Sequence, residues 1–182
     1  THMIHSAKAT GDYFNLPKNT TALLCMSPNY IAGKMMLVRA LTLGWHLDIL
    51  EPISNPLKNS DKNYDFSAMV PMQLHNSLAD IHKIKKLIVG GGTVSNELLS
   101  KIQKVKTEIF ATYGMTETIT HIAVKKLNVF ADAVEKSNFK ILPNIQISVD
   151  DRGCLVIDAP TISEEKVITN DLIEVISSTE FK

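Results

Sequence analysis

Short apolar runs separated by polar segments recur along the first 113 residues. Each run has five or six residues and does not alternate strictly between apolar and polar positions. Runs of this kind are typical of strands buried on both faces, as in a parallel sheet. The pattern predicts strands at residues 22–26, 46–50, 66–70, 86–90 and 108–113.

Helical signals lie between these runs. Residues 29–43 place apolar side chains at helical spacing. Pro71 occupies a first-turn position of a predicted helix over 71–82, and Ser95 is placed to cap another helix over 95–105. Alternating strands and helices imply right-handed crossover connections. We therefore expect an α/β fold with a mostly parallel sheet and flanking helices.

The pattern changes after about residue 127. Strand-like runs then follow one another with very short links, and Asp150 and Gly153 supply turn chemistry between two of them. The sequence thus predicts a division into residues 1–127, the α/β part, and residues 128–182, a small antiparallel β element. The strands expected in this element are residues 139–142, 145–149, 154–159 and 172–176.

Composition narrows the class of protein. The 182 residues are 45% hydrophobic and 21% charged, as in an ordinary globular chain that buries one sizeable core. Nineteen Lys and Arg balance nineteen Asp and Glu, so charge suggests neither a nucleic-acid nor a membrane partner. Small molecules are the expected partners, and composition gives no oligomeric state.

The cysteines and the longest apolar segment bear on where in the cell the protein lies. Cys25 and Cys154 are far apart and both lie in apolar runs, which favours buried, reduced thiols and a cytoplasmic location. The apolar segment over 30–45 is interrupted by Lys34 and Arg39 and is short for a membrane span. We expect no transmembrane helix.

Candidate chemistry gathers after two of the predicted strands. In open parallel sheets, ligands bind outside the carboxyl ends of the strands. If the two strands are neighbours, a glycine loop and a loop rich in hydroxyls face each other across a crevice. Glycines allow close approach of a flat ligand, and a tyrosine ring offers stacking area, as an adenine slot requires. The residues are Gly90, Gly91 and Gly92 after the first strand, and Thr112, Tyr113, Gly114, Thr116 and Glu117 at the end of the second.

Each of these features has a plainer interpretation. The glycines also fit a turn that only lets a helix pack close to its strand. Thr116 can donate to a phosphate oxygen and Glu117 suits Mg²⁺ carrying phosphates, but both also fit a solvated threonine-rich turn. The glycine triplet is not a dinucleotide fingerprint, because Ser95 stands where the pattern needs glycine, and the chain has no Walker A loop.

Four ordered stretches carry a resemblance to a known family. TYGMTET, at residues 112–118, resembles the Tyr-Gly-x-Thr-Glu signature of the adenylate-forming superfamily of acyl-CoA synthetases, peptide-synthetase adenylation domains and luciferases. The upstream glycine loop, the strand-to-helix stretch 66–73 and TNDLIEV at 169–175 follow in the family's order. TNDLIEV is similar to the superfamily's Thr-Gly-Asp-Leu motif. Asn170 replaces the usual glycine there, which changes the turn but leaves Asp171 available.

Residues 27–41 resemble o-succinylbenzoate–CoA ligases of menaquinone synthesis within that superfamily. Arg39 stands six positions after Gly33, as in those enzymes, and Tyr30 falls where many relatives have His. The planar guanidinium suits a carboxylate. The alternative is that Arg39 snorkels to the surface or pairs with a structural acid.

The resemblance implies a role for each residue in the motifs. The ring of Tyr113 would stack on adenine beside the glycine loop, and the acid would lie against Tyr30 and Arg39. His121, close to the cluster, either contacts substrate or is structural. The implied nucleotide-binding residues are Gly90, Gly91, Gly92, Thr112, Tyr113, Gly114 and, for the ribose, Asp171; the implied catalytic residues are Thr116, for the α-phosphate, and Glu117, for magnesium.

The resemblance also implies a reaction. With ATP, Mg²⁺ and coenzyme A, the parent enzyme would convert a carboxylic acid, expected to be o-succinylbenzoate, into an acyl-adenylate and then a CoA thioester. The family's phosphate loop and its Lys-bearing C-terminal lid domain do not occur in these residues, so we expect an inactive fragment. Residues 1–127 would bind nucleotide and acid, and 128–182 would carry the ribose-binding aspartate. The alternatives are a noncatalytic nucleotide-binding or scaffold domain, or an adenylating enzyme for another acid.

Overall fold

The computed structural model describes residues 2–128 and 138–182 of the chain. The five strands predicted before residue 114 are all present, each within two residues of its expected position at either end. Within the described residues the strands are β1 (Thr21–Leu24), β2 (His46–Ile49), β3 (Tyr64–Met69), β4 (Ile84–Val89), β5 (Glu108–Gly114), β6 (His121–Lys126), β7 (Phe139–Ile141), β8 (Gln146–Val149), β9 (Cys154–Asp158), β10 (Val167–Leu172), β11 (Val175–Ser177) and β12 (Glu180–Phe181).

These strands form two sheets. The large sheet has nine strands in the order β11-β12-β7-β6-β5-β4-β3-β1-β2. Its pairs from β2 to β5 are parallel, and its pairs from β5 to β11 are antiparallel. The small sheet is antiparallel in the order β10-β9-β8. The mostly parallel α/β fold with a small antiparallel element is confirmed.

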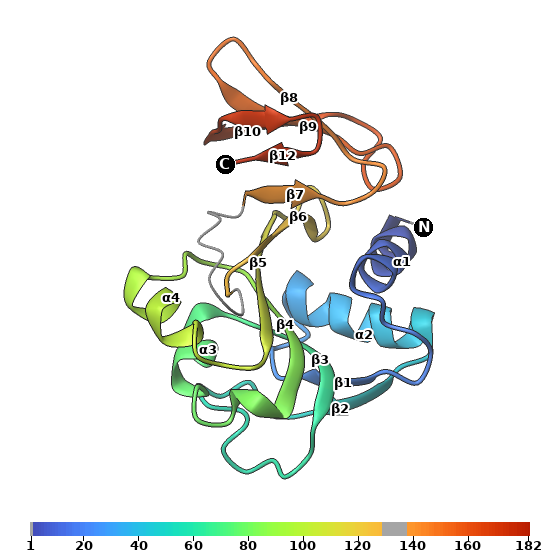
Figure 1. Ribbon diagram of the computed structural model, residues 1–182. Coiled ribbons are helices and arrows are strands. Elements are labelled where there is room, and N and C mark those ends of the chain that lie inside the picture. Colours follow the sequence, from blue (N-terminus) through green and yellow to red (C-terminus); the bar gives the residue numbers. More distant parts are fainter. Residues whose placement is uncertain (1, 129–137) are drawn as a thin grey trace.

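Helices cover both faces of the parallel part of the large sheet (Figure 1). On one face lie α1 (His2–Phe14) and α2 (Ile31–Leu43), and on the other lie α3 (Pro71–Asn76), the 3₁₀ turn η1 (Ile81–Lys83) and α4 (Asn96–Ile102). The alternation of side chains along each strand divides the apolar residues between these faces. In β4, Ile88 faces the α1/α2 side, whereas Leu87 and Val89 face the α3/α4 side.

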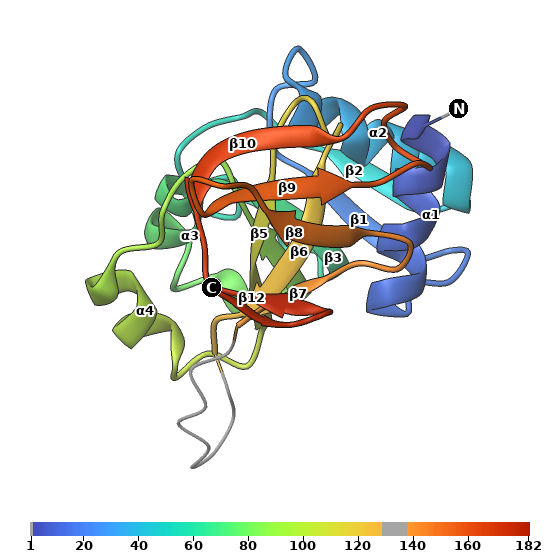
Figure 2. The same cartoon turned by 90° about the horizontal axis from the view of Figure 1, so that it is seen from above.

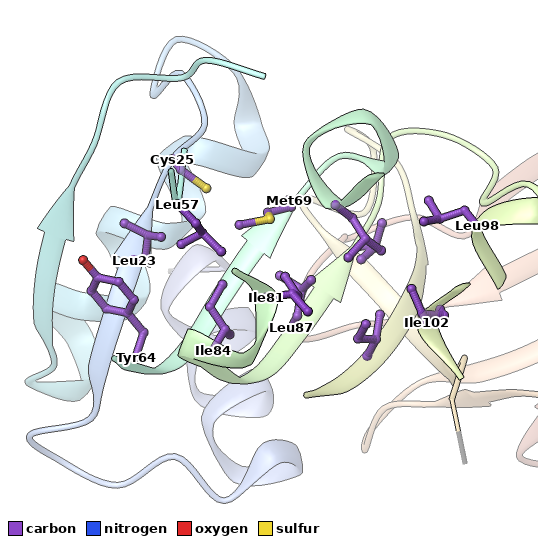
Figure 3. Packing of buried hydrophobic residues seen from close by; sticks show 13 residues of the cluster. Leu23, Cys25, Leu57, Tyr64, Met69, Ile81, Ile84, Leu87, Leu98 and Ile102 are labelled. Atoms are coloured by element: carbon purple, nitrogen blue, oxygen red, sulfur yellow. The ribbon is translucent and has the colours of Figure 1, made fainter. Parts of the chain in front are cut away.

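The core on the α3/α4 side is largely aliphatic, and Figure 3 shows its residues converging between strands and helices. Leu23 and Leu87 reach it from the sheet, and Leu98 and Ile102 from α4. The other face is more aromatic. Phe66 lies between Phe14 and Trp45, with ring centroids 5.8 and 5.5 Å away. Complete burial of such a ring stabilises the fold by about 1.5–3 kcal/mol.

The small sheet lies across the antiparallel end of the large one, as Figure 2 shows from above. Leu155 and Ile157 of β9 pack with Ile122 of β6 and Phe181 of β12 in a third core. The segment after residue 128 therefore contributes both to this small sheet and, through β7, β11 and β12, to the edge of the large sheet. The division at residues 127 and 128 stays a prediction.

Two local predictions need correction, and a third difference is a strand that the sequence did not predict. The helix expected over 71–82 ends at Asn76, where the buried Ser77 hydroxyl donates to Asn55 Oδ1 at 3.2 Å and the chain turns into η1. The strand expected over 172–176 is broken, because its two halves pair in different sheets: β10 with β9, and β11 with β12. Strand β6 was not expected at all.

Capping and thiol predictions agree with the structure. The Ser95 side chain accepts a hydrogen bond from Leu98 N at 3.2 Å and caps α4, and Pro71 stands in the first turn of α3. Cys25 and Cys154 are free and buried. In the described residues, no helix has the length and apolar character that crossing a membrane requires.

Close packing of α2 on the loop after β1 depends on Gly33. A Cβ at this position would collide with the carbonyl oxygen of Ser27, which belongs to the backbone and has little room to move. We expect Gly33→Ala to lower the free energy of unfolding by about 1–3 kcal/mol. Urea denaturation measures the change.

Gly11→Ala is the matched control for this substitution. Its added Cβ would lie 2.8 Å from Leu43 Cδ1, the end of a flexible side chain, and alanine is the better helix former. We expect little change in its unfolding free energy. Equal losses in the two variants would contradict the packing argument.

Candidate functional site

A pocket of about 280 Å³ lies at the carboxyl ends of β3, β4 and β5, on the side of the sheet that α2 covers. Four connections meet there: those that follow β1, β3, β4 and β5. This is the place at which open parallel sheets bind ligands. The lining residues are Met26, Ile31, Ala32, Arg39, Ala68, Met69, Val70, Ile88, Gly90, Gly91, Thr112, Gly114, Met115, Thr116, Ile119, Thr120 and His121.

The two loops singled out from the sequence do lie side by side. Strands β4 and β5 pair in parallel with Val89 opposite Ala111, so the glycine loop and the threonine-rich loop leave the same edge of the sheet. A Cβ on Gly90 would lie 2.5 Å from Thr112 Oγ1. Gly90 therefore allows the two strand ends to approach and keeps this part of the pocket open.

The loop between β5 and β6 is held by its own hydrogen bonds. Thr118, which is fully buried, accepts from Met115 N at 3.0 Å, and its hydroxyl lies 2.8 Å from the carbonyl oxygen of Thr120. Ile119 has φ 65°, a left-handed conformation that a β-branched residue rarely adopts. Strain of this kind is often found at functional sites, where surrounding contacts maintain it.

Thr118 and Thr116 have different roles in this loop, although they are only two positions apart. The internal bonds of Thr118 leave Thr116 and Glu117 exposed, with Thr116 at the pocket. Sequence reasoning missed this support, because nothing in the local pattern distinguishes Thr118 from Thr116.

Arg39 projects from α2 and is 1% exposed, yet it contacts no carboxylate among the described residues. Its Nε donates to Thr10 Oγ1 at 3.3 Å and its Nη2 donates to Thr120 Oγ1 at 3.1 Å. Burial lowers the pKa of the guanidinium to about 10, which leaves it charged at neutral pH. A buried charge without a counterion destabilises a fold. The pocket therefore has an uncompensated cation in its wall.

His121 lies beside this cation and is 4% exposed. Its Nδ1 is 3.2 Å from Thr120 Oγ1, whereas its Nε2 is buried without a hydrogen-bond partner in the described residues. Burial, and then the charge of Arg39, lower the pKa of the imidazole to about 3. His121 is therefore neutral under ordinary conditions.

Tyr113 and Asp171 connect the large sheet to the small one. The Tyr113 hydroxyl donates to Asp171 Oδ2 at 2.5 Å, although the two residues are 58 positions apart. Burial, and then this carboxylate, raise the pKa of the Tyr113 hydroxyl. The ring packs edge-on against Phe181 with centroids 5.4 Å apart. These contacts fix the ring beside the loop that follows β5.

The structure brings some predicted site residues to the pocket and leaves others outside its lining. Gly90, Gly91, Thr112, Gly114, Thr116 and Arg39 line it. Tyr30 is 74% exposed at the start of α2 and does not line it. Nor do Gly92, Tyr113, Glu117 and Asp171. The roles assigned to all of them stay predictions.

Two features bear on how this chain could hold a metal ion. Across residues 2–128 and 138–182, no three His, Cys, Asp or Glu side chains are grouped so as to hold a metal ion. Glu117 is exposed next to Thr116. Magnesium that arrives with phosphates needs only one or two protein carboxylates, so Glu117 fits such an ion and a dedicated metal cage is not required.

Comparison with solved structures gave close matches. An acyl-CoA synthetase (AMP-forming)/AMP-acid ligase II-like protein from Dyadobacter fermentans is 39% identical with a TM-score of 0.90, and the match covers 100% of this chain and 53% of that protein. This chain thus spans about half the length of that relative. Comparisons with protein-family models and with curated protein sequences gave no match.

More distant matches share the fold. Escherichia coli MenE with a bound analogue of OSB-AMS is 17% identical with a TM-score of 0.76, covering 99% of this chain and 43% of that one. O-succinylbenzoate coenzyme A synthetase (MenE) from Bacillus subtilis, in complex with ATP and magnesium, is 17% identical with a TM-score of 0.77, covering 91% and 38%. The fold described above is thus that of the N-terminal domain of acyl-CoA synthetases.

Proposed function

We propose that this chain is the acid- and nucleotide-binding part of an AMP-forming acid–CoA ligase. Its 39% identity to the D. fermentans protein over the whole chain supports that class of enzyme. The observation that carries the proposal is the charge of Arg39, which is buried at the pocket without a carboxylate partner in the described residues. A bound acid would supply the missing counterion.

The acid that fits best is o-succinylbenzoate. This acid has two carboxylates, so one can pair with Arg39 while the other is activated near Thr116. The pocket lining also contains Ala68, Ile88 and Ile31, and such apolar side chains suit an aromatic ring. The charge of Arg39 does not distinguish o-succinylbenzoate from other dicarboxylic aryl acids of similar size, so the choice also depends on the resemblance of residues 27–41.

The nucleotide would lie at the open edge of the pocket. The backbone at Gly90 and Gly91 can approach an adenine ring closely, and the ring of Tyr113, held by Asp171, is the candidate stacking surface. Asp171 has a second carboxylate oxygen with which to accept a ribose hydroxyl. Thr116 would donate to the α-phosphate, and Glu117 would hold the magnesium that neutralises phosphate charge.

These residues would act mainly by positioning the acid and the nucleotide for reaction. A carboxylate oxygen of the acid attacks the α-phosphorus of ATP and pyrophosphate leaves; the thiol of coenzyme A then displaces AMP from the acyl group. Arg39 would fix the far end of the acid, which places the reacting carboxylate beside Thr116. Thr116 would stabilise charge that develops on the phosphate oxygens.

Calorimetric titration with a nonhydrolysable o-succinylbenzoyl-adenosine analogue tests the proposal on this chain. We expect measurable binding that Arg39→Met weakens by about tenfold to a hundredfold, because a charged hydrogen-bonding partner is lost. Asp171→Ala should weaken it by about tenfold.

Lys34→Met is the matched control, since it removes an exposed cation from the same helix. It should leave the affinity unchanged. Binding that is absent from the unsubstituted chain, or that none of these substitutions affects, would contradict the proposed site.

A further inference from the structure

His121 has an unusual combination of properties. It lines the pocket, it is 4% exposed, and its Nε2 has no hydrogen-bond partner among the described residues. Buried polar side-chain atoms normally have a partner, and an unpaired one destabilises the fold. Trp45 Nε1 is also buried and unpaired, but Trp45 does not line the pocket. His121 therefore combines an unpaired, buried ring nitrogen with a place in the lining of the pocket.

Neighbouring hydrogen bonds bear on which nitrogen of His121 carries the proton. The Arg39 guanidinium can only donate, so Thr120 Oγ1 accepts from it at 3.1 Å. The hydroxyl keeps one proton to donate, and we assign it to His121 Nδ1, which lies 3.2 Å away. This relay leaves Nδ1 without a proton and places the proton of the neutral ring on Nε2.

The surroundings of His121 keep that ring neutral. The charged group that acts on it is Arg39 of α2, and a second cation beside a buried guanidinium is unfavourable. The same end of the pocket therefore presents one fixed positive charge and one neutral N–H donor. Both complement an anionic oxygen, and both repel an ammonium or another donor group.

We propose that His121 is a specificity-determining residue that donates from Nε2 to the acid's second carboxylate, the group that Arg39 neutralises. The inference rests on the proposed function and refines its substrate class: the pocket selects an aryl acid with a remote carboxylate over the same acid without one. Arg39 supplies the charge, and His121 supplies a directed hydrogen bond whose geometry Thr120 sets.

Paired titrations separate this inference from the proposed function. One probe is the o-succinylbenzoyl-adenosine analogue, and the other is the same analogue without its benzoate carboxylate. The unsubstituted chain should prefer the first. We expect His121→Phe to reduce that preference by about tenfold to a hundredfold with little effect on the second probe, because a hydrogen bond to a charged group is lost.

His121→Gln is the conservative variant, since its amide can place an N–H near the position of Nε2. It should keep most of the preference, and His46→Gln, a change at an exposed histidine, should keep all of it. Equal weakening of both probes in His121→Phe, or an unchanged preference, would overturn the inference while leaving the proposed function intact. Failure of the unsubstituted chain to bind either probe would overturn both.

Nitrogen NMR of the imidazoles gives a readout that does not depend on a substitution at the site. The chain has six histidines, and His121→Gln identifies the signals of His121 by their disappearance. Near pH 7 we expect an unprotonated Nδ1 and a protonated Nε2. The carboxylate probe should shift the Nε2 proton downfield and the other probe should not. A proton on Nδ1, or an imidazolium in the complex, would contradict the relay.

Discussion

Replacing Arg39 with methionine is expected to stabilise the protein while it weakens binding of the acid. The guanidinium is 1% exposed, and its partners within the described residues are Thr10, Thr120 and the sulfur of Met36, all of them neutral. Exchanging buried charged groups for well-packed apolar ones often raises stability by about 1–4 kcal/mol. Methionine retains much of the side-chain volume, so a gain towards the lower end of that range is expected.

Urea denaturation of Arg39→Met and of the unsubstituted chain at pH 7 measures this gain. Lys34→Met again serves as the control, and its unfolding midpoint should hardly move, because Lys34 is exposed. A lower midpoint for Arg39→Met would mean that the hydrogen bonds to Thr10 and Thr120 outweigh the cost of burying the charge. Arg39 would then be a structural residue, and the argument for a carboxylate ligand would lose its physical basis.

The opposite signs expected for stability and binding have a common cause. The charge of Arg39 is unfavourable in the free protein because the fold provides no counterion in the described residues, and it becomes favourable when an anion arrives. Functional sites commonly retain groups that destabilise the fold in this way. The left-handed conformation of Ile119, which also lines the pocket and has φ 65°, is a second local strain of this kind.

The second large effect is an acid-induced loss of stability that depends on His121. The folded state holds the pKa of this imidazole at about 3, below its ordinary value of 6.5 in the unfolded chain. The unfolded state therefore binds the extra proton first as the pH falls. The contribution of the neutral ring is fully present above pH 6.5 and is lost progressively as the pH falls towards 3.

Comparison of unfolding free energies at pH 7 and pH 4 tests this effect. The unsubstituted chain should lose about 2–3 kcal/mol more than His121→Gln over that interval. Several carboxyl groups have lowered pKa values, among them Asp65 at about 2, so acid weakens both proteins and only the difference between them reports on His121.

His46→Gln provides the matched control, because this histidine is exposed. Its loss of stability between pH 7 and pH 4 should equal that of the unsubstituted chain. If His121→Gln also behaved like the unsubstituted chain, then the imidazole of His121 would titrate normally, and its neutral, buried state would be wrong.

Local pattern was enough to predict most of the parallel sheet. The five apolar runs before residue 114 are strands, and Ser95 and Pro71 mark helix starts as expected. These signals succeed because a strand buried on both faces needs a continuous apolar run, and because helix starts need particular side chains. The prediction of one strand over residues 172–176 failed for the opposite reason. Its two halves are alike in sequence, but they pair with different strands, β9 and β12, and the local pattern contains no information about those partners.

The sequence by itself determined the class of fold, the glycine loop and the threonine-rich loop as candidate site segments, and Arg39 as a candidate for binding an anion. Each of these follows from residues close together in the chain. That the two loops are neighbours was decided by the pairing of β4 with β5. Only the tertiary structure decided that Arg39 meets Thr10 and Thr120 and no carboxylate among the described residues, and that Tyr113 bonds to Asp171. It also decided that His121 is neutral with an unpaired nitrogen. Charge, protonation and hydrogen bonding depend on burial and on partners from distant segments, which no local pattern contains.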